Sequence, residues 1–165
     1  MHRSDRTPDG GFSLIEVILV TILIGIIAAV AIPRFPTIPK KEVAARRLMT
    51  DIRYAKQLAN RLQTRCGIYF IDSTSYRVFQ EDDINNAAIN PATGEGFVVT
   101  LSGQFSGVTM SANFGNTLKF DSLGTPLDSS NTPLSKPPPP NVSISDGTDT
   151  VTVRVEPNTG RVYMP

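Results

Sequence analysis

The feature that most constrains this chain is an apolar run from Phe12 to Ile32, in which Glu16 is the single charged residue. As an α-helix, a run of this length extends about 30 Å, which matches the hydrocarbon core of a bilayer. A carboxylate is costly there, by about 2.5–3.5 kcal/mol at the centre of a membrane helix, so it usually has a partner and a function. The run therefore predicts a membrane helix in which Glu16 is paired.

A polar segment precedes this run and ends in Gly11, directly before Phe12. An ordinary secretory signal has its apolar region before a cleavage site made of small residues. Here the apolar run is too long for such a region, and the nearest candidate for a site of that kind is residues 28–31. A plain membrane anchor, in turn, would not need Glu16. The sequence thus disfavours both an ordinary signal peptide and a plain anchor.

Gly11, Phe12 and Glu16, followed by the uninterrupted apolar run, resemble the class III signal of type IV pilins and pseudopilins. In that family, prepilin peptidase cuts after the glycine, and the new N-terminal phenylalanine is N-methylated. The resemblance implies cleavage between Gly11 and Phe12, N-methylation of Phe12 and a role for Glu16 in filament assembly. Gly25 and Pro33 also lie where pilin helices commonly carry these residues.

The charges that flank the run disagree with this interpretation. Basic residues are more numerous on the C-terminal side: Arg34, Lys40, Lys41, Arg46 and Arg47, against Arg3 and Arg6 in the leader. This bias alone would place the C-terminal domain in the cytoplasm. The bias is less decisive for a long domain, and the peptidase of the family needs a cytoplasmic leader. We therefore expect the domain in the periplasm.

Composition excludes several classes of function. The length of 165 residues suits one domain plus a membrane helix, and the net charge of +1 argues against nucleic acid as an obligatory partner. His2, the one histidine, lies in the leader that the resemblance removes. A chain without it has no Ser-His-Asp or Cys-His arrangement and no histidine-ligated zinc. We expect no enzymatic activity and no cofactor.

Two polar clusters, at residues 81–83 and 128–131, leave calcium binding open as a disfavoured alternative, because calcium prefers oxygen ligands. Major pseudopilins, which the chain resembles, often bind calcium in a loop, but neither cluster has the ligand spacing of an EF-hand. Cys66, the one cysteine, cannot form an internal disulfide. Its apolar surroundings favour a small buried hydrophobic residue over a reactive thiol or an intermolecular link.

Beyond the apolar run, Pro33, Pro36 and Pro39 predict a kinked or non-helical connector. Residues 40–65 then predict a second helix, because apolar residues recur at alternating steps of three and four. This stripe consists of Ala45, Leu48, Ile52, Ala55, Ala59, Leu62 and Cys66.

The rest of the chain is typical of β-structure. We expect strands at 66–71, 75–80, 97–101, 108–111, 117–121, 142–145, 150–155 and 161–164, with loops at 81–95 and 128–141. Three segments, 51–59, 120–126 and 151–162, resemble the GspH/FimT-like minor pseudopilins. The resemblance implies that the second helix carries the globular domain and that a hairpin closes it.

The predicted fold is α+β: a long N-terminal hydrophobic helix of the pilin type, followed by an amphipathic helix packed on a mainly antiparallel β-sheet. The predicted parts are a leader at 1–11, a transmembrane and filament-core helix at 12–32, the connector at 33–39 and a periplasmic globular domain of the GspH type at 40–165.

The resemblance implies a minor pseudopilin of a type II secretion pseudopilus, anchored in the inner membrane by a single helix, that supports protein secretion across the outer membrane. The alternative is a minor pilin of a type IV pilus that acts in assembly, adhesion or DNA uptake, although Arg154 and Arg161 alone are thin support for DNA binding. Implied partners are other pilin or pseudopilin subunits, prepilin peptidase and the inner-membrane assembly platform. Pairing Glu16 with the Phe12 amine of a neighbouring subunit would relieve the cost of its charge.

Overall fold

The computed structural model describes residues 13–31, 39–135 and 137–165. The chain divides into two compact units, Met1–Thr37 and Ile38–Pro165, which are treated separately below. The predicted cleavage site at Gly11 and Phe12 and most of the proline connector lie outside the described residues.

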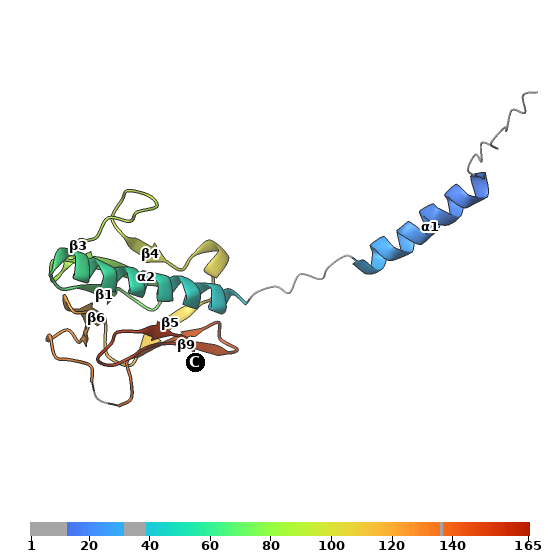
Figure 1. The fold of residues 1–165 in the computed structure, drawn as a ribbon. Helices are drawn as coiled ribbons and strands as arrows, with labels where there is room; N and C mark the ends of the chain where they lie inside the picture. Colours follow the sequence, from blue (N-terminus) through green and yellow to red (C-terminus); the bar gives the residue numbers. More distant parts are fainter. Residues whose placement is uncertain (1–12, 32–38, 136) are drawn as a thin grey trace, which may run out of the picture. The chain divides into compact units, whose positions relative to one another are not determined.

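In the described part of the first unit, residues 14–31 form helix α1 (Leu14–Ala31), in the segment where the apolar run predicts it (Figure 1). Its first turn begins with Ser13, whose carbonyl oxygen accepts the Glu16 N–H at 2.9 Å. The Thr21 hydroxyl donates a hydrogen bond within the helix, to the Val17 carbonyl oxygen at 2.9 Å. In the ranges that the structure describes, none of the helices combines the length and apolarity that a membrane crossing requires.

The second unit begins with α2 (Lys40–Leu62), which follows Pro39 directly. The helix is amphipathic, and its apolar stripe is buried as predicted at Ala45, Leu48, Ile52, Ala55 and Ala59. Gln63 ends the helix by adopting a left-handed conformation with φ 55°. Two expectations are therefore wrong: the helix stops before residue 65, and Leu62, in its last turn, is 40% exposed.

Ten strands follow, in two antiparallel sheets. The first sheet has the order β3-β2-β1-β6-β7, with β4 also paired to β2. Its strands are β1 (Cys66–Phe70), β2 (Ser75–Gln80), β3 (Asp83–Ala87), β4 (Val98–Thr100), β6 (Thr117–Phe120) and β7 (Pro126–Leu127). The second sheet has the order β10-β9-β8-β5. Its strands are β5 (Thr109–Ala112), β8 (Asn141–Ser145), β9 (Thr150–Val155) and β10 (Val162–Tyr163).

The loop expected at 81–95 is wrong in part, because β3 forms there and pairs with β2. Apart from Ile84, its residues from Asp83 to Ala87 have low strand propensity, so no pattern in the sequence points to a strand. The hairpin that joins the two strands turns through Glu81 and Asp82, both at φ 59°. Short β7 and the 3-10 helix Gly103–Phe105 are likewise absent from the sequence prediction.

Helix α2 contacts strands of both sheets (Figure 1), and the side chains buried between them form one core. Large side chains such as Tyr76, Phe120 and Ile144 are at most 1% exposed. Gly67 lets β1 and β6 approach closely, since a Cβ there would collide with the Leu118 carbonyl oxygen. Cys66 is 0% exposed, which confirms its expected burial. The α+β class of the prediction is confirmed.

Candidate functional site

Glu16 lies in the first turn of α1 and is exposed. A carboxylate is favourable at this end of a helix, where the free N–H groups carry partial positive charge. Among residues 13–31, which the structure describes in this unit, no cation forms an ion pair with it. Its predicted partner, the Phe12 amine of another subunit, and the Gly11–Phe12 bond fall outside what the structure describes.

The side chains around Glu16 form a helix surface that is apolar on every side. The eleven large apolar residues from Leu14 to Ile27 are each 46–78% exposed. A helix that is hydrophobic all round is normally buried, either in a core or in a membrane. At Gly25, an added Cβ would meet nothing within 4 Å, so packing within the described part of the unit does not require this glycine. Within this unit, the described residues therefore leave the apolar surface of the helix uncovered.

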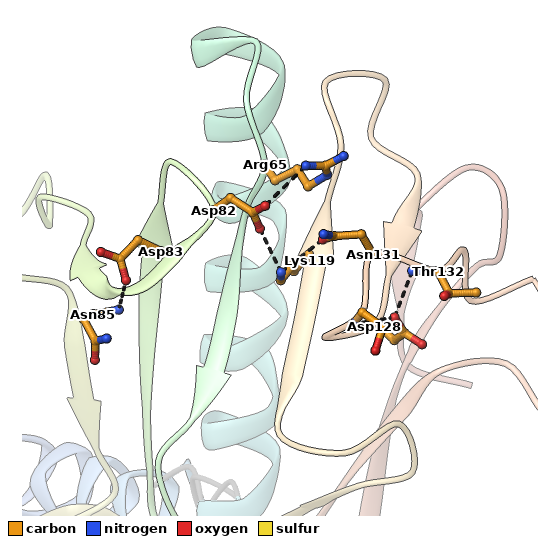
Figure 2. Close-up of polar contacts among 9 residues, drawn as sticks. Arg65, Asp82, Asp83, Asn85, Lys119, Asp128, Asn131 and Thr132 are labelled. Atoms are coloured by element: carbon orange, nitrogen blue, oxygen red, sulfur yellow. Dashed lines mark hydrogen bonds and ion pairs between the residues drawn. The ribbon is translucent and has the colours of Figure 1, made fainter.

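In the second unit, the two clusters considered for calcium meet at a lysine (Figure 2). The Lys119 ammonium donates to Asp82 Oδ1 at 2.8 Å and to Asn131 Oδ1 at 3.0 Å. Arg65 adds a second cation, at 3.2 Å from Asp82 Oδ2. Lys119 is 7% exposed, so its charge depends on these partners. An ammonium group thus occupies the position between the two clusters.

One carboxylate oxygen of Asp128 and one of Asp83 accept hydrogen bonds within their own turns. Asp128 Oδ1 accepts the N–H groups of Ser130 and Thr132 at 2.8 and 2.9 Å, and Asp83 Oδ1 accepts that of Asn85 at 2.8 Å (Figure 2). In the part of the chain that the structure describes, no group of three or more Asp, Glu, His and Cys side chains could hold a metal ion. The geometry supports a structural role for both clusters.

A second buried cation connects the start of α2 to the β8–β9 hairpin. Lys41 Nζ lies 3.0 Å from both Asp146 Oδ2 and Asp149 Oδ2. The hydrogen bond to Asp149 is the main cause that raises the pKa of Lys41. The pKa of Asp146 falls to about 2, first because its side chain accepts the Asp149 N–H and then because of Lys41. This clamp secures the first turn of the helix directly after the connector.

A third polar contact lies within the core. Tyr76 Oη donates to Asp51 Oδ2 at 2.6 Å, and Arg47 Nε lies 4.0 Å from the same oxygen. Burial raises the pKa of Asp51, against the opposing effect of the Tyr76 hydrogen bond. Burial and the neighbouring Asp51 charge raise the pKa of Tyr76. The pair holds α2 against β2, and its geometry supports a structural role.

Sequence comparison decides the family. Residues 44–160 match the family model described as type II transport protein GspH. The chain belongs to the GspH family. Residues 6–32 match the prokaryotic N-terminal methylation motif, which precedes the GspH region and includes the predicted cleavage site. No curated protein sequence matches at a significant level.

Solved structures resemble the GspH region in fold. The minor pseudopilin EpsH of the Vibrio cholerae type 2 secretion system is 12% identical, with a TM-score of 0.51, and the match covers 77% of this chain and 97% of EpsH. The type IV minor pilin FimU of Pseudomonas aeruginosa is 14% identical, with a TM-score of 0.49, over 75% of this chain and 91% of FimU. At such identity the EpsH likeness shows the fold alone, and the FimU likeness is too weak to add to it.

The GspH domain also contains sites that sequence reasoning missed. Nothing near Lys41, Lys119 or Asp51 in the sequence indicates which distant residue each contacts. Arg161, which was considered for DNA binding, lies with its guanidinium 5.9 Å from the centre of the Tyr163 ring. Together with the methylation motif, the GspH domain makes this chain a subunit of the pilin and pseudopilin type.

Proposed function

We propose that this chain is a minor pseudopilin of a type II secretion pseudopilus and supports protein secretion across the outer membrane. The observation that carries the proposal is the order of the two family matches, in which a methylation motif at 6–32 leads directly into a GspH domain at 44–160. The minor pilin of a type IV pilus remains the alternative function, because both systems use subunits with this arrangement.

In this proposal, prepilin peptidase removes residues 1–11, and the new amine at Phe12 is N-methylated. Residues 12–32 hold the subunit in the inner membrane, with the GspH domain in the periplasm, until the assembly platform adds it to the filament. The exposed apolar side chains of α1 support this step, because lipid or neighbouring helices would cover them.

Glu16 then determines the position of the subunit among its neighbours. An unpaired carboxylate in an apolar bundle is costly, and the Phe12 amine of an adjacent subunit would neutralise it. Only one alignment of the two helices brings these groups together, so the pair sets their register. Gly25 supports close packing, since a glycine on a helix surface lets another backbone approach.

Deletion of the gene tests the function. We expect the mutant to lose a set of extracellular proteins, which appear in the cell fraction by quantitative proteomics, while surface pili and twitching persist. Complementation with the parent gene must restore secretion, and complementation with the Glu16→Val form must not. Loss of pili with normal secretion would assign the chain to the type IV pilus instead. Normal secretion and normal pili together would contradict both functions.

A further inference from the structure

The GspH domain carries a groove of about 430 Å³ between the C-terminal half of α2 and the turn before β10. We call it the basic groove, and its lining consists of Arg53, Lys56, Gln57, Asn60, Gly160, Arg161 and Val162. Three of these side chains carry a positive charge, and the two amides add further hydrogen-bond donors. None of the lining residues is acidic.

The three cations of the basic groove contact neutral groups. Arg53 Nη2 donates to the Val162 carbonyl oxygen at 2.8 Å, and Lys56 Nζ donates to the Thr159 carbonyl oxygen at 2.5 Å. Arg161 lies over the Tyr163 ring. Within the described residues, no carboxylate lies within ion-pair distance of these three cations. Four cations elsewhere in the described part of the domain have such partners, namely Lys41, Arg47, Arg65 and Lys119, whereas others, such as Arg46, do not.

The shape of the basic groove is held by tight backbone packing at one end. A Cβ at Gly160 would collide with the Gly124 carbonyl oxygen, and a Cβ at Gly124 would collide with the Lys56 side chain. Both glycines have positive φ, of 60° and 85°, which other residues rarely adopt. The turn at 121–125 therefore lies directly against two residues that line the groove.

That turn presents an exposed apolar side chain beside the groove. Leu123 is 85% exposed, the highest value among the exposed large hydrophobic residues. Asp121 Oδ1 accepts the N–H groups of Leu123 and Thr125 at 2.9 and 2.8 Å, which fixes the turn. A leucine exposed on a turn that packs against Lys56 and Gly160 is suited to a ligand with both carboxylates and an apolar side chain.

We propose that the basic groove and Leu123 form a docking surface for an acidic segment of a different subunit of the same filament. Carboxylates of that segment contact Arg53, Lys56 and Arg161, and an apolar side chain packs against Leu123. The choice of a filament subunit as partner rests on the proposed function. A phosphate backbone would use the cations but would leave the exposed leucine without a role.

Three carboxylates of this chain, on Asp82, Asp146 and Asp149, do not fit the role of partner. Asp82 is bound by Lys119 and Arg65, and Asp146 and Asp149 are bound by Lys41. Docking any of them into a second copy would first break these contacts. A segment of a different subunit whose carboxylates are free of such contacts is therefore favoured over these three carboxylates.

Peptide binding by the full-length protein in detergent micelles tests whether the basic groove prefers a negatively charged ligand. The probe is a fluorescent peptide in which glutamates alternate with leucines, and its control carries glutamine at each glutamate position. Fluorescence anisotropy should show binding of the acidic peptide that is at least about tenfold tighter than that of the control and that weakens with salt. Equal binding of the two peptides, or binding of neither, would overturn the proposal.

Single substitutions test where on the GspH domain the acidic peptide binds. Arg161→Gln and Leu123→Ser should each weaken binding of the acidic peptide by about fivefold or more. Arg46→Gln is the matched control, because Arg46 is exposed on α2 and outside the groove, and it should change binding by less than about twofold. Equal melting temperatures show that all variants are folded. Equal effects of the control and the groove variants would overturn the location.

A short single-stranded oligonucleotide tests the other macromolecular ligand. If it binds more tightly than the acidic peptide, and Arg161→Gln abolishes that binding while Leu123→Ser does not, the groove is a nucleic-acid site and the proposal is wrong. The gene deletion separates this failure from failure of the proposed function. A secretion defect without peptide binding leaves the function standing and removes the docking surface.

Discussion

In α1, the large apolar side chains from Leu14 to Ile27 are 46–78% exposed, whereas Leu48 and Ile52 of α2 are at most 1% exposed. Both helices contain leucine, isoleucine and alanine, so residue type does not explain the difference. Helix α2 confines its apolar residues to one stripe, and two sheets of the same chain cover that stripe. Helix α1 has apolar residues on all sides, and a single neighbouring layer cannot cover them.

The comparison shows that the two units depend on different partners for their stability. The GspH domain gains the free energy of apolar burial, about 25 cal/mol per Å², within its own chain. For α1, the described residues of its own unit provide no such burial, and in the proposed function lipid or other helices supply it. Changes in α1 should therefore affect processing and assembly, and changes in the GspH domain should affect folding.

The largest expected effect concerns processing at Gly11. A bulky residue there, as in Gly11→Leu, should block cleavage completely. The reason is that the class III signal, which this sequence resembles, needs a small residue before the cut. Mass spectrometry of membrane-extracted protein should show the intact leader. The matched variant Gly11→Ala retains a small side chain and should still yield a chain that begins at N-methyl Phe12. Cleavage of the leucine variant would contradict the assigned site.

Glu16→Val should reduce incorporation into filaments by about tenfold or more, because the charge pair that sets register is lost. The variant should still be cleaved, and the GspH domain should keep its melting temperature. Immunoblots of sheared filaments against whole cells measure the effect. Thr21→Val is the control, since the Thr21 hydroxyl bonds within its own helix and contributes no charge. Normal assembly of the Glu16 variant would disprove the pairing.

Within α2, the same comparison between a buried and an exposed apolar residue can be made at Ile52 and Leu62. Ile52→Ala should lower the free energy of unfolding by about 2–5 kcal/mol, because it leaves a cavity at a side chain that is 0% exposed. Leu62→Ala should cost about 1 kcal/mol or less, since Leu62 is already 40% exposed. Urea denaturation of the detergent-solubilised protein measures both. Similar losses for the two variants would mean that Leu62 is covered in solution.

The smallest effect is a pH dependence of the Lys41 clamp. The pKa of Asp146 is about 2, below its ordinary value of 3.8, so its contribution to stability is present above pH 3.8 and is lost as pH falls toward 2. The raised pKa of Lys41 contributes stability below pH 10.5 that is lost at higher pH. Melting temperatures from pH 7 to pH 2 should therefore fall less steeply in Asp146→Asn than in the parent.

A control distinguishes this clamp from another carboxyl group with the same titration range. The pKa of Asp72 is also about 2, mainly because Ser75 and Thr74 donate hydrogen bonds to it. Asp72→Asn should flatten the acid side of the curve and leave the alkaline side unchanged. Asp146→Asn should also reduce the loss above pH 10.5, since it removes one of the two negative charges beside Lys41. An unaltered alkaline side in Asp146→Asn would contradict the clamp.

Local patterns predicted much of the fold. The stripe in α2 and the alternation in β9 and the β1–β2 hairpin each extend over several residues, so the pattern identifies the element. The prediction failed where the pattern was weak or where an element ends. Strand β3 is polar and forms because β2 offers it an edge, and Leu62 is exposed because Gln63 turns the chain away.

The candidate sites also divide into those that a local sequence pattern predicts and those that it does not. Gly11, Phe12 and Glu16 form a motif within a few residues, so sequence alone assigns them a role, and that role stays a prediction. The basic groove joins α2 to the turn before β10, and the Lys119 cluster joins residues that are 12 and 37 positions apart. No local pattern encodes such contacts, because they depend on how the sheets pack.

The sequence by itself determined the two helices, the α+β class and the membership of the GspH family, because each rests on periodicity or on a motif of adjacent residues. Only the tertiary structure decided which charges are neutralised. Lys119 lies between two acidic loops, whereas Arg53, Lys56 and Arg161 face solvent or backbone oxygen atoms. The physical reason is that Coulomb energy depends on distance in space, and packing alone sets the distance between residues that are remote in the chain.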